Sequence, residues 1–426
     1  MTTTTPRAAA RPGAAPADAG RTDTGGAPMF RLTPAVQHYA WGSTTAIPSV
    51  LGTVPDGRPV AELWLGAHPS APAVVEDGAG GVALDALLEQ DPTGHLGQDV
   101  VQRFGARLPY LLKLIAADAP LSLQVHPSIE RAREGFAEED ARGVARDAPD
   151  RSYRDENHKP ELVYALTRFE AMVGFRAPRR VAELLADLDC DLARDLHRIL
   201  VADPNPTGVR AAFEWLLSPT TRPGADDVSA FVEACGRRLA DGSPSPRTDR
   251  TVLRLAQAYP GDPGAVTSVL LNPVTLEPGE ALFVPAGAVH AYLSGLGVEL
   301  MANSDNVLRA GLTAKHVDTV ELLHNVDCVA APPIRIAPER VFTSTEIFYA
   351  PVDDFELSVT RLTDEGQVRV PGRGPRVLLC LEGDVVVSTG DGHVLELVRG
   401  QSAFVPASAG MLCAQGAGVL VQADVP

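Results

Sequence analysis

Hydrophobic residues change their spacing twice along the chain. From Phe30 onwards they form short runs, for example at 61–66 and 108–116, which are broken by Gly, Pro and Asp as is typical of strands. Between residues 179 and 259 they recur at every third or fourth position, as on one face of amphipathic helices. The strand pattern then returns. We therefore predict a mainly β fold with an α-helical insertion.

The C-terminal part of the chain repeats a segment that follows the helical region. Residues 276–286, LEPGEALFVPA, align without a gap on residues 397–407, LVRGQSAFVPA, at a constant offset of 121 positions. Each copy contains a Gly turn, a strand and a Pro-Ala turn, a pattern that resembles the jelly-roll modules of cupins. The first copy continues to His290, whereas Met411 stands at the corresponding position of the second copy. The repeat thus predicts two cupin modules in addition to the helical domain.

These patterns divide the chain into five segments. The first segment, residues 1–28, has few bulky apolar residues to bury, and we expect it to be a disordered leader. The helical insertion splits the first cupin into two parts, and a second cupin follows at the C-terminal end. The predicted segments are 1–28 for the leader, 29–177 for the first part of the first cupin, 178–265 for the insertion, 266–330 for the second part and 331–426 for the C-terminal cupin.

Composition narrows the class of protein. The chain has 426 residues, enough for two or three domains, and 45% of them are hydrophobic. Its formal net charge of -17 disfavours nucleic acid as a partner, because binding to a polyanion needs a basic surface. No apolar run is long enough to cross a bilayer, no secretion signal is evident, and the five scattered cysteines fit a reducing compartment. We expect a soluble, cytoplasmic monomer that binds neither membrane nor nucleic acid.

Three separated segments offer ligands for one metal ion. Gln124 and His126 are two positions apart, so their side chains share one face of an extended strand. Lys159 and Glu161 have the same spacing, and His290 adds a distant imidazole. Imidazole, carboxylate and amide groups suit Zn²⁺, and they also fit iron or manganese. We expect one metal site in the first cupin and none in the C-terminal cupin.

Lysine is rare in this chain. Lys113, Lys159 and Lys315 are lysines, whereas the other 34 of the 37 basic residues are arginine. A position that keeps lysine is a candidate for a role that needs a compact ammonium or a group able to shift its pKa. Lys113 lies inside an apolar run, where an unpaired charge would be unfavourable. A coding bias against lysine is the alternative explanation.

Five motifs resemble those of type I mannose-6-phosphate isomerases. They are QHYAWG at 37–42, AELWLGAHP at 61–69, PLSLQVHP at 120–127, NHKPE at 157–161 and NSDNVLRAGLT at 303–313. The resemblance extends from about residue 30 to about residue 320, in the same order and with the helical insertion. It implies a zinc-dependent aldose-ketose isomerase that interconverts mannose 6-phosphate and fructose 6-phosphate. It also implies a catalytic arginine at Arg309 and zinc ligands at Gln124, His126, Glu161 and His290.

Such an isomerisation moves a proton between C1 and C2 of the sugar through a cis-enediolate, whose charge needs a cation beside it. Arg309 would orient the substrate or add fixed positive charge, because a guanidinium stays protonated. For the general base we favour Glu299, whose apolar neighbours would raise its pKa, and Lys159 and His158 are alternatives. Candidate donors to the phosphate of the substrate are Ser122, Lys113 and Lys315.

Two other functions fit a metal-containing cupin. One is a non-catalytic module that binds sugar phosphate, and the other is a metal-dependent oxygenase. An oxygenase would favour a histidine-rich iron site, whereas an amide and a carboxylate accompany two histidines here. A coupled assay for fructose 6-phosphate formation distinguishes the isomerase from the binding module.

Overall fold

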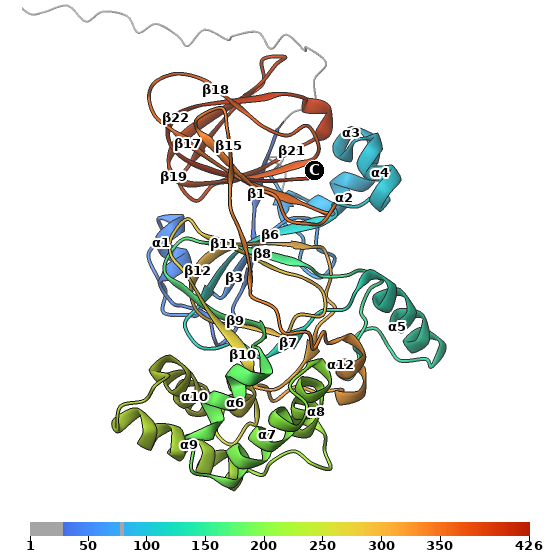
Figure 1. The fold of residues 1–426 in the computed structure, drawn as a ribbon. Helices are drawn as coiled ribbons and strands as arrows, with labels where there is room; N and C mark the ends of the chain where they lie inside the picture. The colour runs from blue at the N-terminus through green and yellow to red at the C-terminus, as the bar shows by residue number, and fades with distance from the viewer. Residues whose placement is uncertain (1–28, 77–80) are drawn as a thin grey trace, which may run out of the picture.

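The computed structural model describes residues 29–76 and 81–426, so the predicted leader at 1–28 lies outside the described residues. In the described part, two eleven-stranded antiparallel sheets lie one above the other, and twelve α-helices flank them (Figure 1). The fold is therefore mixed α/β, with the large β sheets and the helical region that the sequence predicts and with further helices beside them.

The first sheet carries the strands that lie on both sides of the helical insertion in the sequence. Its main path is β14-β11-β8-β12-β6-β3-β2, and the remaining strands pair beside it. Its members are β2 (Ala35–Gln37), β3 (Glu62–Leu65), β6 (Tyr110–Ala117), β7 (Gln124–Val125), β8 (Glu161–Ala165), β9 (Phe169–Phe175), β10 (Leu271–Leu276), β11 (Ala281–Val284), β12 (His290–Ala302), β13 (Leu308–Arg309) and β14 (Ile334–Ile336).

The second sheet consists mainly of C-terminal strands, but it also contains three early ones. Its members are β1 (Phe30–Thr33), β4 (Val74–Val75), β5 (Val82–Ala83), β15 (Glu339–Val341), β16 (Thr345–Phe348), β17 (Glu356–Leu362), β18 (Val368–Val370), β19 (Arg376–Thr389), β20 (Val394–Val398), β21 (Ser402–Val405) and β22 (Leu412–Asp424). Strand β1 pairs with β21, and β14 pairs with β11 of the first sheet. Strand pairing thus links residues across the predicted boundaries, and the division into five segments stays a prediction.

Helices occur in five places along the described chain. They are α1 (Ala46–Leu51), α2 (Leu84–Gln90), α3 (Pro92–Leu96), α4 (Gln98–Phe104), α5 (Ile129–Ala141), α6 (Pro178–Ala186), α7 (Asp191–Ala202), α8 (Pro206–Leu217), α9 (Ala225–Ala240), α10 (Pro246–Ala258), α11 (Gly264–Thr267) and α12 (Thr319–Asn325). Helices α6 to α10 confirm the helical period between residues 179 and 259. Helices α1 to α5 were missed, because the first four have only five to seven residues each and α5 is charged at most positions.

The helical insertion packs against one end of the first sheet. Its buried residues share one hydrophobic core with residues of β9 and β12. The ring of Phe213 from α8 meets the ring of Phe175 from β9 edge to face, with 5.3 Å between the ring centroids. The insertion therefore supports the strands that lead to His290.

Strand β12 joins the two parts of the first sheet. Its C-terminal half pairs with β6 and β8, whereas its N-terminal half pairs with β7 and β9. The pairing register with β9 shifts between Tyr292 and Ser294, and Gly295 follows with a φ of 122°. A Cβ atom at Gly295 would lie 2.7 Å from the carbonyl oxygen of Arg168, so this bend requires glycine.

The internal repeat is visible in the strands. Strands β11 and β21 lie at the repeat offset, and each precedes a strand of thirteen residues, β12 or β22. In the first sheet Val284 of β11 pairs with Glu161, and in the second sheet the corresponding Val405 pairs with Arg376. A fully buried arginine thus takes the place of a candidate ligand, while Met411, at the place of His290, is half exposed.

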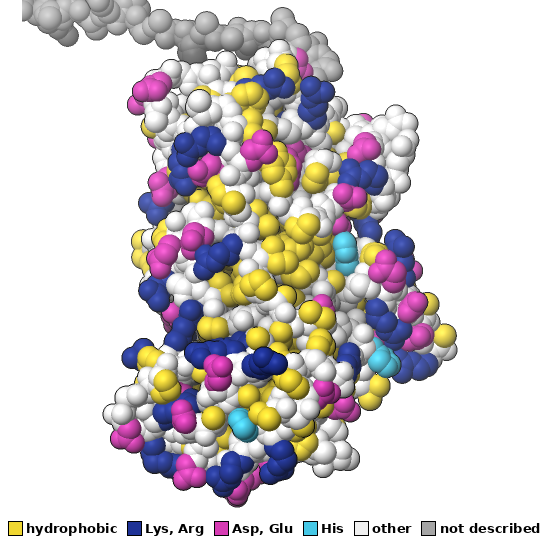
Figure 2. All heavy atoms as spheres, in the orientation of Figure 1, with side chains coloured by type: hydrophobic (Ala, Val, Ile, Leu, Met, Phe, Trp, Pro, Cys, Tyr) yellow, Lys and Arg dark blue, Asp and Glu magenta, His cyan; other side chains and the backbone are white. Residues whose placement is uncertain are grey.

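The surface carries charges of both signs. On the face shown in Figure 2, acidic and basic side chains are interspersed around an apolar patch at mid-height. In the described ranges, no helix has both the length and the apolar character needed to cross a bilayer. All five cysteines are free thiols, as their scattered positions predicted.

Candidate functional site

Three of the predicted metal ligands come together from three strands. His126 directly follows β7, Glu161 begins β8 and His290 begins β12, and all three side chains are buried. Nε2 of His126 lies 3.1 Å from Oε1 of Glu161, and Nε2 of His290 lies 3.4 Å from Oε2. One potential ligand atom of each residue lies within 4.8 Å of the other two. The three residues therefore form a candidate metal site.

Backbone carbonyl groups decide which nitrogen of each histidine faces Glu161. Nδ1 of His126 lies 2.8 Å from the carbonyl oxygen of Asn306, and Nδ1 of His290 lies 3.0 Å from that of Ala288. Because a carbonyl oxygen only accepts hydrogen bonds, Nδ1 of each ring carries a proton, and in the neutral form of a ring Nε2 then presents a lone pair. Burial lowers the pKa of His126 to about 4, so this ring is neutral near pH 7.

Nε2 of His126 is buried and has no hydrogen-bond partner among the residues that the structure describes. Its contact with Glu161 is within ion-pair distance but lacks hydrogen-bond geometry, and the neutral ring carries no charge that could form an ion pair. Two imidazole lone pairs that face a carboxylate repel it unless a cation lies between them. The donor set therefore fits a metal ion.

Gln124 joins this site through strand pairing. In β7 it is the direct partner of His290 on one side and of Arg309 in β13 on the other. Directly opposed residues of antiparallel strands point to the same face, so these three side chains form a row. The amide nitrogen of Gln124 donates to Oγ of Ser122 at 3.4 Å, which leaves the amide oxygen free to act as a ligand. The row places Arg309 about 10 Å from His290, two strand spacings away.

Glu161 accepts one donor at each carboxylate oxygen. Nζ of Lys159 lies 3.1 Å from Oε1, and the hydroxyl of Tyr292 donates to Oε2 at 2.8 Å. Burial acts to raise the pKa of Glu161, but the ammonium of Lys159 holds it well below its ordinary value. The carboxylate is therefore ionised, as a metal ligand must be.

A second buried cluster lies beside the first. Nζ of Lys113 lies 3.1 Å from Oε2 of Glu299 and 4.0 Å from Oε2 of Glu62, and it stands over the ring of Trp64. The pairing follows from the sheet, because Lys113 of β6 is the direct partner of Glu299 in β12 and of Trp64 in β3. Burial acts to lower the pKa of Lys113, but Glu299 and Glu62 raise it above its ordinary value. This lysine is therefore charged and is enclosed by carboxylates.

Glu299, the favoured base, has a raised pKa. Burial is the main cause, Lys113 opposes it, and the negative charge of Glu161 adds to it. His158, one of the alternative bases, points elsewhere: its Nε2 lies 3.0 Å from Oδ2 of Asp354, which precedes β17 in the second sheet. Lys159, the other alternative, contacts Glu161. Glu299 is thus a buried residue of the first sheet whose surroundings increase its basicity.

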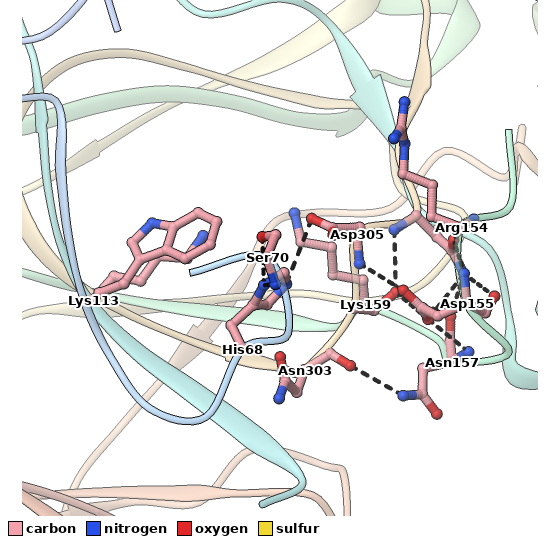
Figure 3. A network of polar contacts seen from close by, with 12 residues as sticks. His68, Ser70, Lys113, Arg154, Asp155, Asn157, Lys159, Asn303 and Asp305 are labelled. Carbon is pink, nitrogen blue, oxygen red and sulfur yellow. Dashed lines mark hydrogen bonds and ion pairs between the residues drawn. The ribbon is translucent and has the colours of Figure 1, made fainter. Parts of the chain in front are cut away.

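Two loops beside Lys159 are locked together by polar contacts (Figure 3). Oγ of Ser304 donates to Asp155 at 2.9 Å, and the backbone N–H of Asp305 donates to the same carboxylate at 2.8 Å. Nε2 of His68 lies 3.4 Å from Oδ1 of Asp305, and burial lowers the pKa of His68 to about 4. Figure 3 shows Asp305, His68 and Lys159 converging from different segments. These contacts fix the loop at Asp155, which precedes Lys159 and β8.

Basic side chains gather on the other side of the row. Burial and the nearby Arg154 lower the pKa of Arg309, and burial, Arg309 and Arg154 lower that of the exposed Lys315. The positive charges of these side chains are therefore close enough to interact. Of the three phosphate-binding candidates, Lys315 lies in this group, Ser122 lies beside Gln124, and Lys113 lies in the carboxylate cluster.

Three residues in these clusters were not singled out as site residues by the sequence analysis. Tyr292 is two positions after His290 on the same strand, which is a signal that the strand period offers. Glu62 and Asp305 lie inside quoted motifs, but only the sheet pairing and the loop contacts bring them to Lys113 and His68.

Comparisons with known proteins agree with this geometry. Residues 29–178 match the family model "Phosphomannose isomerase type I, catalytic domain". The chain is 38% identical to mannose-6-phosphate isomerase of Escherichia coli K12, over 92% of this chain and 99% of the relative. It is 33% identical to mannose-6-phosphate isomerase 1 of Arabidopsis thaliana, over 89% of each chain.

The fold is also similar to that of solved structures. A crystal structure of mannose 6-phosphate isomerase in its holo, zinc-bound form superposes with a TM-score of 0.85 and 37% identity, over 93% of this chain and 99% of the other. Similarity at this level spans both sheets and the helical insertion. The chain therefore belongs to the type I phosphomannose isomerase family.

Proposed function

We propose that this protein is a zinc-dependent mannose-6-phosphate isomerase, which interconverts mannose 6-phosphate and fructose 6-phosphate. The observation that carries the proposal is the pair of histidines whose Nε2 lone pairs face the buried carboxylate of Glu161. Family membership supplies the substrate class, because relatives with full-length coverage carry this name. We also propose that the two sheets are the two cupin modules that the internal repeat predicts.

His126, Glu161, His290 and Gln124 would hold the zinc ion. With one carboxylate and three neutral ligands the site keeps a net charge of about +1, and bound zinc would polarise the carbonyl oxygen of the open-chain sugar. Lys159 supports the site by orienting Glu161.

We assign the proton transfer between C1 and C2 to Glu299. A buried carboxylate with a raised pKa is a stronger base than an exposed one, and Lys113 holds it in place. Removal of the proton from C2 of the aldose and its return to C1 of the enediolate, together with transfer of the hydroxyl proton from O2 to O1, give the ketose. Lys159 is the alternative base, and His158 is the least favoured candidate because its side chain is engaged by Asp354 of the second sheet region.

Arg309 and Lys315 would bind the charged parts of the substrate. Arg309 lies in the row with Gln124 and His290, so its guanidinium is placed to stabilise negative charge on the sugar. Lys315, with Arg154 nearby, favours the phosphate group. Lys113 is a poorer phosphate ligand, because Glu299 and Glu62 already surround it.

A coupled assay for fructose 6-phosphate formation from mannose 6-phosphate tests the proposal. We expect turnover with zinc-loaded protein, loss of turnover after chelation, and recovery on addition of Zn²⁺. The Glu161→Gln variant should bind zinc weakly and be inactive. Zinc-loaded protein that binds the sugar phosphate without turnover would instead support the non-catalytic binding module, and the enzyme assignment would be abandoned.

A further inference from the structure

Tyr292 contacts the candidate metal site but is not one of its ligands. It lies two positions after His290 in β12, its side chain is buried, and its hydroxyl donates to Oε2 of Glu161 at 2.8 Å. The hydroxyl therefore uses one lone pair of Oε2, and the same oxygen lies 3.4 Å from Nε2 of His290.

The two oxygens of Glu161 are held in the same manner. Oε1 contacts Nζ of Lys159 at 3.1 Å and Nε2 of His126 at 3.1 Å. Oε2 contacts the hydroxyl of Tyr292 and Nε2 of His290. Each oxygen thus contacts one donor and one imidazole, and rotation of the carboxylate would break both sets of contacts.

The two donors differ in stiffness. Lys159 reaches Oε1 with a flexible four-carbon chain, whereas only two side-chain torsions orient the ring of Tyr292. Its ring meets Phe169 edge to face with 5.4 Å between centroids, and its centroid lies 5.8 Å from that of His290. Tyr292 is therefore the more rigid support of the carboxylate.

We propose that Tyr292 is a positioning residue of the metal site, whose hydroxyl holds the carboxylate of Glu161 toward the two histidines. The inference rests on the metal site of the proposed function and adds a residue to it. Without the hydroxyl, Glu161 keeps Lys159 as its donor and turns toward the ammonium, so Oε2 moves away from His290.

A purely structural role is the competing explanation. Tyr292 belongs to a hydrophobic core with Phe169, Val173 and Val284, and its ring alone fills that space. Phenylalanine has the same ring, so this explanation predicts that Tyr292→Phe leaves metal affinity unchanged. The positioning role predicts a loss, because groups that orient metal ligands contribute about 10- to 100-fold to affinity.

The test measures Zn²⁺ affinity of the full chain by competition with a chromogenic chelator. We expect Tyr292→Phe to weaken zinc binding about 10- to 100-fold and to change the visible absorption spectrum of the Co²⁺-loaded protein. The matched control is Tyr164→Phe, which removes the hydroxyl of another buried tyrosine that contacts Arg361 at 3.2 Å. This control should bind zinc within threefold of the unaltered chain.

The Glu161→Gln chain provides a second comparison. If the hydroxyl acts through the carboxylate, adding Tyr292→Phe to Glu161→Gln should change zinc affinity less than threefold. A Tyr292→Phe protein that binds zinc as tightly as the control would overturn the inference, as would one that no longer folds by circular dichroism in the metal-free state. Failure of the unaltered chain to bind zinc would refute the metal site itself, and is thus distinct from failure of the role of Tyr292.

Discussion

Lys113 provides the sharpest test of how the buried charges are balanced. Its ammonium lies 3.1 Å from Glu299 and 4.0 Å from Glu62, and the three side chains are buried. Lys113→Met keeps much of the length of the side chain and removes its charge. Removing one partner of a buried ion pair destabilises a protein by about 3–5 kcal/mol, because the other charge stays buried without compensation. This is a large part of the roughly 5–15 kcal/mol that separates a folded domain from its unfolded state.

The same substitution changes the pKa of Glu299. Burial already raises this pKa and Lys113 opposes the rise. An opposite charge within about 4–6 Å lowers the pKa of a carboxyl by about 1–3, so Lys113→Met should raise that of Glu299 by a similar amount. Between the unfolded and the folded pKa, the folded chain binds one proton more than the unfolded chain. Stability of the variant should therefore be greatest in acid and should fall as the pH rises through the folded pKa.

Urea unfolding followed by circular dichroism at pH 5 and pH 8 measures this effect. We expect Lys113→Met to lose more stability at pH 8 than at pH 5, and Lys113→Met/Glu299→Gln to regain part of the loss. If Glu299 is the base, the acid limb of the activity profile moves to higher pH by about 1–3 units in the single variant. Lys315→Met, at an exposed position, is the control and should stay within about 0.5 kcal/mol. Equal stability of Lys113→Met at both pH values, with an unshifted acid limb, would refute the reasoning.

Two other changes test separate parts of the molecule. Arg309→Ala should lower kcat about 10²- to 10³-fold. Metal analysis should find the same zinc content, because Arg309 lies two strands from His290. Loss of zinc would contradict the role assigned to Arg309. In the second sheet, burial raises the pKa of Asp424 to about 7 from an ordinary 3.8, although Arg376 opposes the shift. The folded chain therefore holds a proton that the unfolded chain releases, so stability should fall by up to about 4 kcal/mol as the pH rises from 4 to 8. Asp424→Asn should flatten this decline in urea unfolding measured across the pH range, and an unchanged slope would exclude Asp424 as its cause.

The helical insertion and the repeated strands were predictable because their signals are local. Hydrophobic residues recur at every third or fourth position over five consecutive helices, α6 to α10, and a pattern of this length is easily recognised. The offset between the two repeat copies matches the bounds of β11 and β21, since the same turn chemistry precedes the same strand. Helices α1 to α4 were not predictable, because five to seven residues complete at most two turns.

The candidate site was predictable only as a set of residue types. Gln124, His126, Glu161 and His290 were recognised from strand spacing and motif resemblance, and the structure brings the last three within contact of each other. Tyr292 and Glu62 were not singled out as part of the site, because their relevance depends on which strands are neighbours. His158 was a reasonable base beside Lys159 in the sequence, but adjacent residues of an extended segment point to opposite sides, and its side chain reaches Asp354 in the second sheet.

The sequence by itself determined the classes of element, the internal repeat and the ligand types, because each of these depends on residues close together in the chain. The tertiary structure decided the protonation pattern and the partners. The carbonyl groups of Asn306 and Ala288 direct Nε2 of both histidines to Glu161. Strand pairing places Lys113 against Glu299, and puts Arg376 of the second sheet where Glu161 stands in the first. Charges and hydrogen bonds act over a few ångströms in space, whereas these groups are separated by up to about two hundred residues in sequence, so only the folded chain reveals them.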